Sequence, residues 1–194
     1  MKTTLTILAF ISASFACFPQ DISPEIKFIE EINWTIQVPE GFDVIELEEF
    51  EKIREKGKKA IEDTFGAKPE DSTKVILSLR NGQFNILEVN YQPNFTPKNE
   101  DYTSTLRETK LLIYEMFTDQ MPGIIPDTSS TVEYIDKLTF YVYHVTLGLP
   151  EKRSFKIHMY MRLFDDKDWT FNIMYMDEEK GQEMLEAFRN STFD

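Results

Sequence analysis

Apolar and polar residues alternate with a period of two in several segments, the first of which begins near residue 34. Polar residues separate Trp34, Ile36 and Val38, and Pro39 and Gly41 follow them. Because successive side chains of a β-strand point to opposite faces, this alternation predicts a half-buried strand. Proline and glycine then end the strand.

A second pair of strands is predicted further along the chain. Residues 74–80 and 84–92 are both rich in aliphatic side chains, and Asn81 and Gly82 lie between them. An Asn-Gly pair readily takes the positive φ angles of a tight turn. The segment therefore predicts a β-hairpin.

Apolar residues at helical spacing predict a helix early in the chain and another at its end. Residues 46–66 form the first, with acidic first turns and Gly66 as its stop signal. The terminal helix follows Asp177, a residue type that caps helix N-termini well. Its apolar side chains that fall on one side are Met184, Leu185 and Phe188.

A further helix is predicted between these two, over residues 105–120. Thr105 and Glu108 have the spacing of a capping box, in which each side chain bonds the other residue's backbone N–H. The apolar residues that we expect this helix to bury are Leu106, Ile113, Met116 and Phe117.

Three strand-like runs fill the C-terminal third of the chain: residues 133–147, 154–164 and 169–176. The Asp-Asp-Lys-Asp sequence of residues 165–168 links the last two runs as a turn. Its three carboxylates are an incomplete ligand set for Ca²⁺, since the glycine and the downstream glutamate of an EF-hand loop are missing. Aspartate is also common in turns for its own backbone contacts.

If each neighbouring pair of these runs forms a symmetric hairpin, Tyr141 faces Tyr160 and Tyr143 faces His158. The same sheet face continues through the pairs Arg162–Phe171 and Phe164–Trp169 and through Ile173 and Tyr175. The other face carries Phe140, Val142, Ile157, Met159, Met161, Leu163 and Met174. Both faces are then apolar enough to need covering. We expect an α+β fold, an antiparallel sheet of about six strands sandwiched by helices on both faces.

The first 17 residues have the composition of a secretory signal peptide. Lys2 is followed by an apolar stretch over residues 5–11 and then by small residues. The apolar stretch is too short to span a bilayer as a stable anchor. We expect residues 1–17 to be removed, residues 18–31 to form a tether, and residues 32–194 to fold as a single α/β domain.

Cys17 is the single cysteine of the chain and ends this segment. It lies where the lipidated cysteine of a bacterial lipoprotein would lie, although Ser14 and Phe15 match a lipobox loosely. Cleavage by ordinary signal peptidase after Ala16 explains the same residues. Both processing routes remain open, and both place the protein in the periplasm, on the outer membrane or outside the cell.

The composition indicates a folded and strongly acidic domain. The hydrophobic fraction of 41%, with 16 Phe, 8 Tyr and 2 Trp, can supply a large core. The formal net charge is −13, and removing residues 1–17 takes away one positive charge, at Lys2, to leave −14. Such a surface repels polyphosphates and anionic head groups. It argues against nucleic acid as a partner, and against membrane association except through a lipid on Cys17.

Two segments carry a family resemblance: residues 34–42 (WTIQVPEGF) and the ending from Trp169 to Phe193 (WTFNIMYMDEEKGQEMLEAFRNSTF). With the order of predicted elements, they make residues 32–194 resemble the PsbP-like superfamily. That group includes the extrinsic subunit of photosystem II, a Ran-binding release factor and small bacterial lipoproteins of unassigned role. The resemblance implies a PsbP-like α/β/α fold and a non-enzymatic role. It implies no site residues.

Motifs of the common catalytic and metal-binding classes are absent from the sequence. There is no HExxH, CxxC or Gly-x-Ser-x-Gly pattern. On the symmetric register, His144 and His158 fall on opposite faces, and they could bind one metal only if that register is wrong by one residue. We expect no catalytic residues, no metal site and no cofactor.

The most suggestive candidates for ligand binding are aromatic and polar residues that the register places on one face. Aromatic rings beside a few polar groups are typical of small-ligand pockets. The same residues also fit a hydrophobic core that a helix covers, in which the polar ends of their side chains reach the edge of the core. The candidates are Tyr141, Tyr143, His158, Tyr160, Arg162 and Trp169.

We therefore expect an exported, envelope-associated binding or accessory protein without catalytic activity, whose partner is a protein or a small molecule. The alternative is an exported hydrolase, which would need an open cleft with converging carboxylates. A structural subunit of a surface complex would instead expose a large apolar patch.

Overall fold

A computed structural model describes residues 25–46, 73–93, 95, 101–121 and 123–194, together with positions 48, 49, 51, 52 and 55. The predicted signal peptide, Cys17 and most of the predicted helix 46–66 lie outside the described residues. The strands are β1 (Ile26–Ile29), β2 (Trp34–Gln37), β3 (Asp43–Val44), β4 (Lys74–Asn81), β5 (Asn85–Gln92), β6 (Asp127–Ile135), β7 (Leu138–Gly148), β8 (Ser154–Phe164), β9 (Lys167–Tyr175) and β10 (Thr192–Phe193). Among the described residues, α2 (Tyr102–Gln120) and α3 (Glu178–Arg189) are the α-helices with defined bounds, and Glu30–Ile32 and Pro150–Lys152 form short 3-10 helices.

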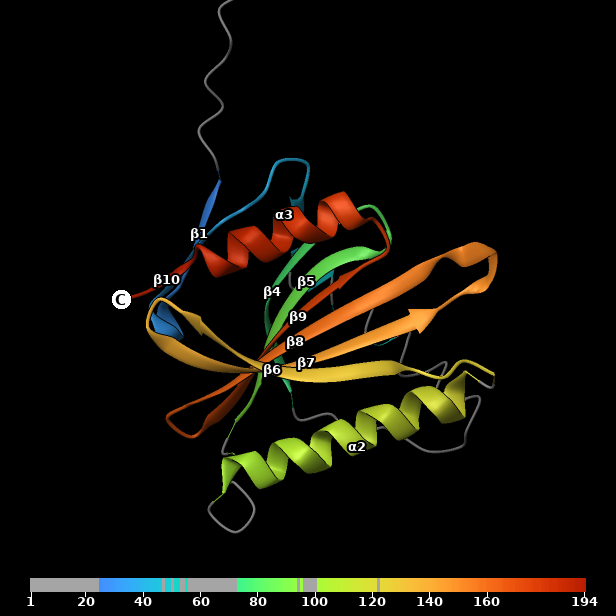
Figure 1. Cartoon of the computed structure of the whole chain (residues 1–194). Coiled ribbons are helices and arrows are strands. Elements are labelled where there is room, and N and C mark those ends of the chain that lie inside the picture. Colours follow the sequence, from blue (N-terminus) through green and yellow to red (C-terminus); the bar gives the residue numbers. More distant parts are fainter. Residues whose placement is uncertain are drawn as a thin grey trace, which may run out of the picture.

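Seven strands form one sheet in the order β3-β4-β5-β9-β8-β7-β6, and every neighbouring pair is antiparallel. A smaller sheet has the order β1-β2-β10. Helix α3 lies across one face of the large sheet and helix α2 across the other (Figure 1). The predicted α+β sandwich is confirmed, with seven strands in place of about six. Within the described residues, no helix combines the length and the apolar character needed to cross a membrane.

The sheet face under α3, here called the α3 face, holds the larger core. Helix α3 and the small sheet pack on it, and aromatic rings fill the space between them. Trp34 donates from its indole Nε1 to Ser191 Oγ at 2.7 Å, which ties β2 to the end of α3. The largest side chains that this core buries are Trp34, Phe140, Tyr160, Trp169, Phe171 and Phe188.

The opposite face, here called the α2 face, packs against helix α2. Leu106 is the buried residue of this helix, and it belongs to one hydrophobic cluster with Tyr143, Val145 and Ile157 of the sheet. The helix begins at Tyr102, because the Asp101 carboxylate accepts a hydrogen bond from Thr103 N at 3.0 Å. The predicted capping box is therefore not the start of the helix.

The burial predicted for this helix was wrong at one position. Leu106 is buried and Ile113 and Phe117 pack against the core, but Met116 is 43% exposed. Leu111 and Leu112, on the outer side, are also exposed. The helix therefore uses a narrower apolar stripe than the spacing indicated.

One predicted strand is divided into two in the structure. The run 133–147 is two strands, because Asp136 and Lys137 both take positive φ angles, 44° and 67°, and form a tight turn between β6 and β7. Most of β6 is rich in hydroxyl residues, so its apolar signal is weak.

The tether prediction for residues 18–31 was wrong at its end, because β1 pairs with β2 there.

The predicted register of β7 and β8 was wrong by one residue. Strand β7 extends to Gly148, which pairs with Ser154, so Tyr141 lies opposite Met161 and His144 opposite His158. A shift of one residue moves every side chain of a strand to the other face relative to its partner. Tyr141 and Tyr143 therefore lie on the α2 face.

The predicted register of β8 and β9 was wrong by two residues, which leaves the faces unchanged. Phe164 lies opposite Lys167, so the connecting turn has two residues instead of four, and Arg162 lies opposite Trp169. Asp165, at the turn, has a φ of 53°. Side chains predicted to share a face on these two strands do share it.

Candidate functional site

The corrected register brings the two histidines of the chain together on the α3 face. His144 of β7 and His158 of β8 lie opposite each other, and their Nδ1 atoms are 2.7 Å apart. One of these nitrogens must carry the proton and the other must accept it, because a hydrogen bond holds a single proton between two nitrogens. The two neutral rings therefore take opposite tautomers.

The histidine pair is the middle of a chain of four hydrogen-bonded side chains. His144 Nε2 lies 2.8 Å from Thr131 Oγ1 on β6, and His158 Nε2 lies 3.1 Å from the Tyr175 hydroxyl on β9. The Tyr175 ring also stacks on His158, with centroids 5.6 Å apart and planes 4° apart. We call Thr131, His144, His158 and Tyr175 the histidine chain. A change of tautomer at one histidine requires the whole chain to reverse its donors and acceptors.

A second polar group, next to the histidine chain, connects α3 to β6. Arg189 donates from Nε and Nη2 to the two carboxylate oxygens of Glu133 at 2.9 and 3.0 Å, and from Nη2 to the Tyr160 hydroxyl at 3.2 Å. Burial by itself raises the pKa of Glu133, but the hydrogen bonds and charge of Arg189 outweigh it and hold that pKa below its usual value. Burial raises the pKa of Tyr160. The group is therefore one ionised pair with a neutral phenol.

The histidine chain is neutral because its surroundings disfavour positive charge. The pKa of His158 is lowered to about 4, chiefly by burial and also by His144, Arg189 and Lys156, against the opposing effect of Glu133. Burial also lowers the pKa of His144. Geometry points the same way, since two protonated rings would direct two N–H donors at each other.

We expect acid to destabilise the protein through this pair. Both histidine pKa values are lower in the folded chain than the ordinary 6.5, so the unfolded chain binds more protons as the pH falls from about 6.5 to about 4. The stability that the two neutral histidines contribute is fully present above pH 7. Because the rings are partly exposed, solvent screening reduces this contribution. We expect the free energy of unfolding to fall by about 1 kcal/mol between pH 7 and pH 5.

Denaturant unfolding at pH 7 and pH 5, on the native chain and on His158→Phe, measures this loss. The variant controls for the effect of carboxylates on stability, because the same carboxylates are present in both proteins. We expect its stability to change less between the two pH values than that of the native chain. Equal changes in both proteins, or a His158 NMR titration midpoint near 6.5, would contradict the prediction.

The six residues predicted from the sequence to bind a ligand are not brought together. His158, Tyr160, Arg162 and Trp169 lie on the α3 face, where Tyr160 and Trp169 are fully buried. Tyr143 and Tyr141 lie on the other face against α2, and their arrangement was predicted wrongly because the register was wrong. The shared pocket drawn from that register does not form.

Arg162 and Asp168 have structural partners. The Arg162 guanidinium donates from Nη1 to the Thr139 carbonyl at 2.7 Å and lies over the Phe164 ring. Asp168 accepts a hydrogen bond from the Tyr102 hydroxyl at 2.6 Å, whereas Asp165 and Asp166 are exposed. Among the described residues, no three or more His, Cys, Asp or Glu side chains are placed to hold one metal ion.

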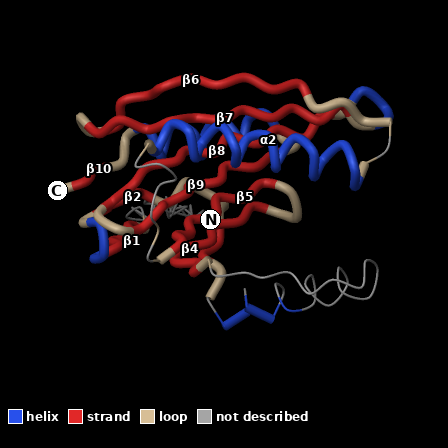
Figure 2. Tube along the Cα trace, turned by 90° about the horizontal axis from the view of Figure 1, so that it is seen from below, coloured by secondary structure: helices blue, strands red, loops and turns tan. Residues whose placement is uncertain are grey.

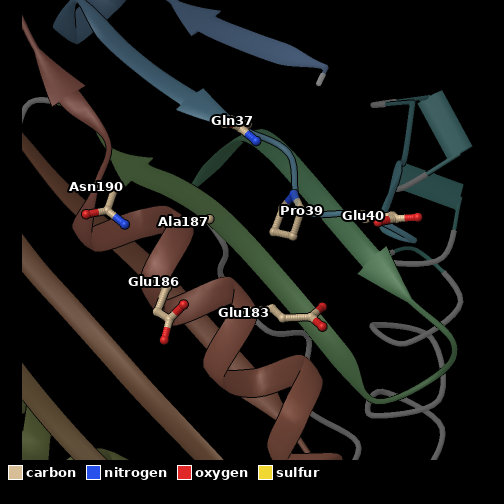
Figure 3. Close-up of a pocket in the computed structure, with 7 residues that line it drawn as sticks. All are labelled: Gln37, Pro39, Glu40, Glu183, Glu186, Ala187 and Asn190. Carbon is tan, nitrogen blue, oxygen red and sulfur yellow. The ribbon is translucent and has the colours of Figure 1, made fainter. Parts of the chain in front are cut away.

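A polar groove of about 380 Å³ lies between α3 and the segment after β2. Figure 3 shows side chains of α3 along one side of it and those of the β2 end along the other. Glu183 is already paired with Lys180, whose Nζ is 2.8 Å away. The residues that line the groove are Gln37, Pro39, Glu40, Glu183, Glu186, Ala187 and Asn190.

An apolar pocket of about 290 Å³ lies where the connection between β7 and β8 meets the end of α2 and the turn between β4 and β5. Here it is called the apolar pocket. Arg153 is the one charged residue among those that line it, and Phe84 and Met121 leave 47% and 37% of their surface exposed. The lining residues are Phe84, Met121, Leu147, Leu149, Arg153, Phe155 and Met176.

Sequence reasoning missed both the histidine chain and the apolar pocket. The histidines depend on a register that one residue decides. The pocket had a weak signal: Phe84 follows the Asn81-Gly82 turn, and Met121 follows the predicted end of a helix. Large apolar side chains at such positions lie outside the regular apolar stripes, and they indicate a surface that another group can cover.

No family model matches the sequence, and no curated protein matches it significantly. Eleven chains among the solved structures match the fold, and one is the solution structure of cyanobacterial PsbP (CyanoP) from Synechocystis sp. PCC 6803. That match has a TM-score of 0.54 and 11% sequence identity, and it covers 92% of this chain and 98% of that one. The chain therefore has a PsbP-like fold, as the sequence resemblance predicted.

Proposed function

We propose that this protein is a non-catalytic accessory protein of the cell envelope that acts by binding. One observation carries the proposal. The polar side chains of the α3 face bond one another, whereas the apolar pocket leaves large hydrophobic side chains open to solvent. The PsbP-like fold and the signal-like residues 1–17 support it as well.

The chemistry of the apolar pocket suggests the class of ligand. Its volume is just below the usual range for small-molecule sites, and its wall is aliphatic and aromatic except at Arg153. The guanidinium of Arg153 lies 3.5 Å from Glu151 in a largely exposed ion pair, which contributes little and can be exchanged. The proposed ligand is a small molecule with an apolar body and one acidic group.

Titration with 8-anilinonaphthalene-1-sulfonate, a fluorescent molecule of this chemistry, tests the proposal. We expect saturable binding at one site of the folded protein. Met121→Glu should weaken this binding about tenfold or more, because it places a carboxylate in the apolar wall beside the anionic probe. Arg153→Gln should weaken it less, through the loss of one charged partner.

Met116→Glu is the matched control. It changes the same residue type at similar exposure, 43% against 37%, within α2, whereas Met121 directly follows that helix, and Met116 does not line the pocket. We expect its affinity for the probe to stay within about twofold of the native value, since surface changes away from a site have small effects. Equal weakening by both glutamate variants, or no saturable binding by the native protein, would rule the pocket out.

A further inference from the structure

Strand β6 forms a long free edge of the seven-stranded sheet. It comprises nine residues, Asp127–Ile135, and pairs with β7 in continuous register without a bulge. In the order of the sheet, no strand lies beyond it among the described residues. Figure 2 shows β6 as the outermost strand, with α2 lying over β7 and β8. One side of its backbone therefore has unpaired N–H and C=O groups.

This edge lacks most of the features that usually prevent strands from pairing between molecules. Such features are charged side chains, above all lysine, together with proline, a bulge or a very short strand. The charged residues of β6 are Asp127 and Glu133, and Glu133 is already paired with Arg189. The sequence of β6, DTSSTVEYI, contains neither lysine nor proline. The other edge strands are shorter: β3 and β10 have two residues each and β1 has four. Val132 and Tyr134 are also 49% and 75% exposed on β6.

We propose that β6 is a dimerisation surface, on which β6 of a second copy of this chain pairs antiparallel across a twofold axis. A twofold pairing that uses all nine residues has one register, centred on Thr131. It places Thr131 opposite its own copy and Ser130 opposite Val132 of the second copy. The seven-stranded sheets of the two copies then continue into each other.

The charges of β6 suit this register. Glu133 lies opposite Ser129 of the second copy, and Asp127 lies opposite Ile135, so no two acidic residues face each other directly. The nearest acid to Glu133 is the diagonal Asp127 of the second copy, and Arg189 already neutralises Glu133. Tyr134 lies opposite Thr128, an aromatic–β-branched pair of the kind that stabilises sheets. This self-complementarity favours a second copy over an unrelated partner.

The proposal is independent of the apolar pocket, none of whose lining residues belongs to β6. A cysteine cross-link tests both the dimer and its register. In a Cys17→Ser background, Thr131→Cys places two cysteines opposite each other across the axis, at about 4.5 to 5.5 Å between Cα atoms, a separation that a disulfide spans. We expect mild oxidation to convert this variant into a covalent dimer.

Ser129→Cys in the same background is the control. In the proposed register the two copies of residue 129 are four residues apart along the strands, or about 13 Å, so they cannot form a disulfide. Cross-linking of Thr131→Cys without Ser129→Cys supports the proposal. Failure of Thr131→Cys, or equal cross-linking of both variants, overturns it.

Sedimentation equilibrium on otherwise native chains gives a second measurement. Ser129→Glu places an acid opposite Glu133 twice in each dimer and should weaken association roughly threefold to tenfold, whereas Ser129→Lys should not. Val132→Lys should also weaken association. Leu112→Lys, at an exposed apolar residue of α2, should not. A native chain that stays monomeric at high concentration, or variants that all behave alike, would disprove the pairing.

Discussion

Replacing Phe188 by alanine is expected to lower the free energy of unfolding by about 4 kcal/mol. Phe188 is fully buried, and its ring lies 4.7 Å from Tyr160, 5.0 Å from Phe171 and 5.8 Å from Phe140, measured between centroids. Alanine removes these contacts and leaves a cavity that rigid neighbouring rings cannot close. A loss of this size is a large part of the total stability of a domain.

Urea unfolding followed by circular dichroism measures this effect, and two variants calibrate it. Phe188→Leu keeps most of the volume and should cost about 1.5 kcal/mol or less. Phe84→Ala removes the same group from a side chain that is 47% exposed, so its effect should be much smaller. Equal losses for Phe84→Ala and Phe188→Ala would show that the core under α3 is not where the structure places it.

Gly181→Ala is expected to destabilise the protein by about 2 kcal/mol, even though alanine usually favours a helix over glycine by about 1 kcal/mol. Gly181 lies in the first turns of α3, directly against the ring of Tyr175. A Cβ atom at this position would overlap the carbon atoms of that ring. The ring or the helix must then move, and the stacking of Tyr175 on His158 is disturbed.

A double-mutant cycle separates the overlap from a general effect on the helix. Tyr175→Leu removes the aromatic ring, so Gly181→Ala should cost less in that background than in the native one. Gln182→Ala, at the exposed neighbouring position, should change stability by no more than about 0.5 kcal/mol. A stabilising effect of Gly181→Ala in the native background would contradict the contact.

The elements whose signals are local were predicted well. The terminal helix follows Asp177, whose carboxylate accepts hydrogen bonds from Glu179 N and Lys180 N, and it buries Met184, Leu185 and Phe188 as expected. The hairpin of β4 and β5 turns at Gly82, whose φ of 64° is one that glycine takes without strain. Capping and turn chemistry depend on neighbours in the sequence, so the sequence reveals them.

The arrangement of side chains between strands depended on single residues that carry no such signal. One residue at the end of β7 decided that His144 meets His158 and that Tyr141 and Tyr143 lie on the other face. The hydroxyl-rich β6 was hidden because its strand is half solvent-exposed and supplies few apolar residues. Both cases concern pairing between strands. The local pattern indicates that two strands pair, but it does not fix which of their residues lie opposite each other.

The sequence by itself determined that this chain folds as an acidic domain in which helices sandwich an antiparallel sheet, because apolar side chains leave both faces of its last strands. Only the tertiary structure decided which polar groups meet, where an open pocket remains and which edge of the sheet stays free. Those features arise where strands from distant parts of the chain align, and a one-residue change in alignment exchanges the two faces.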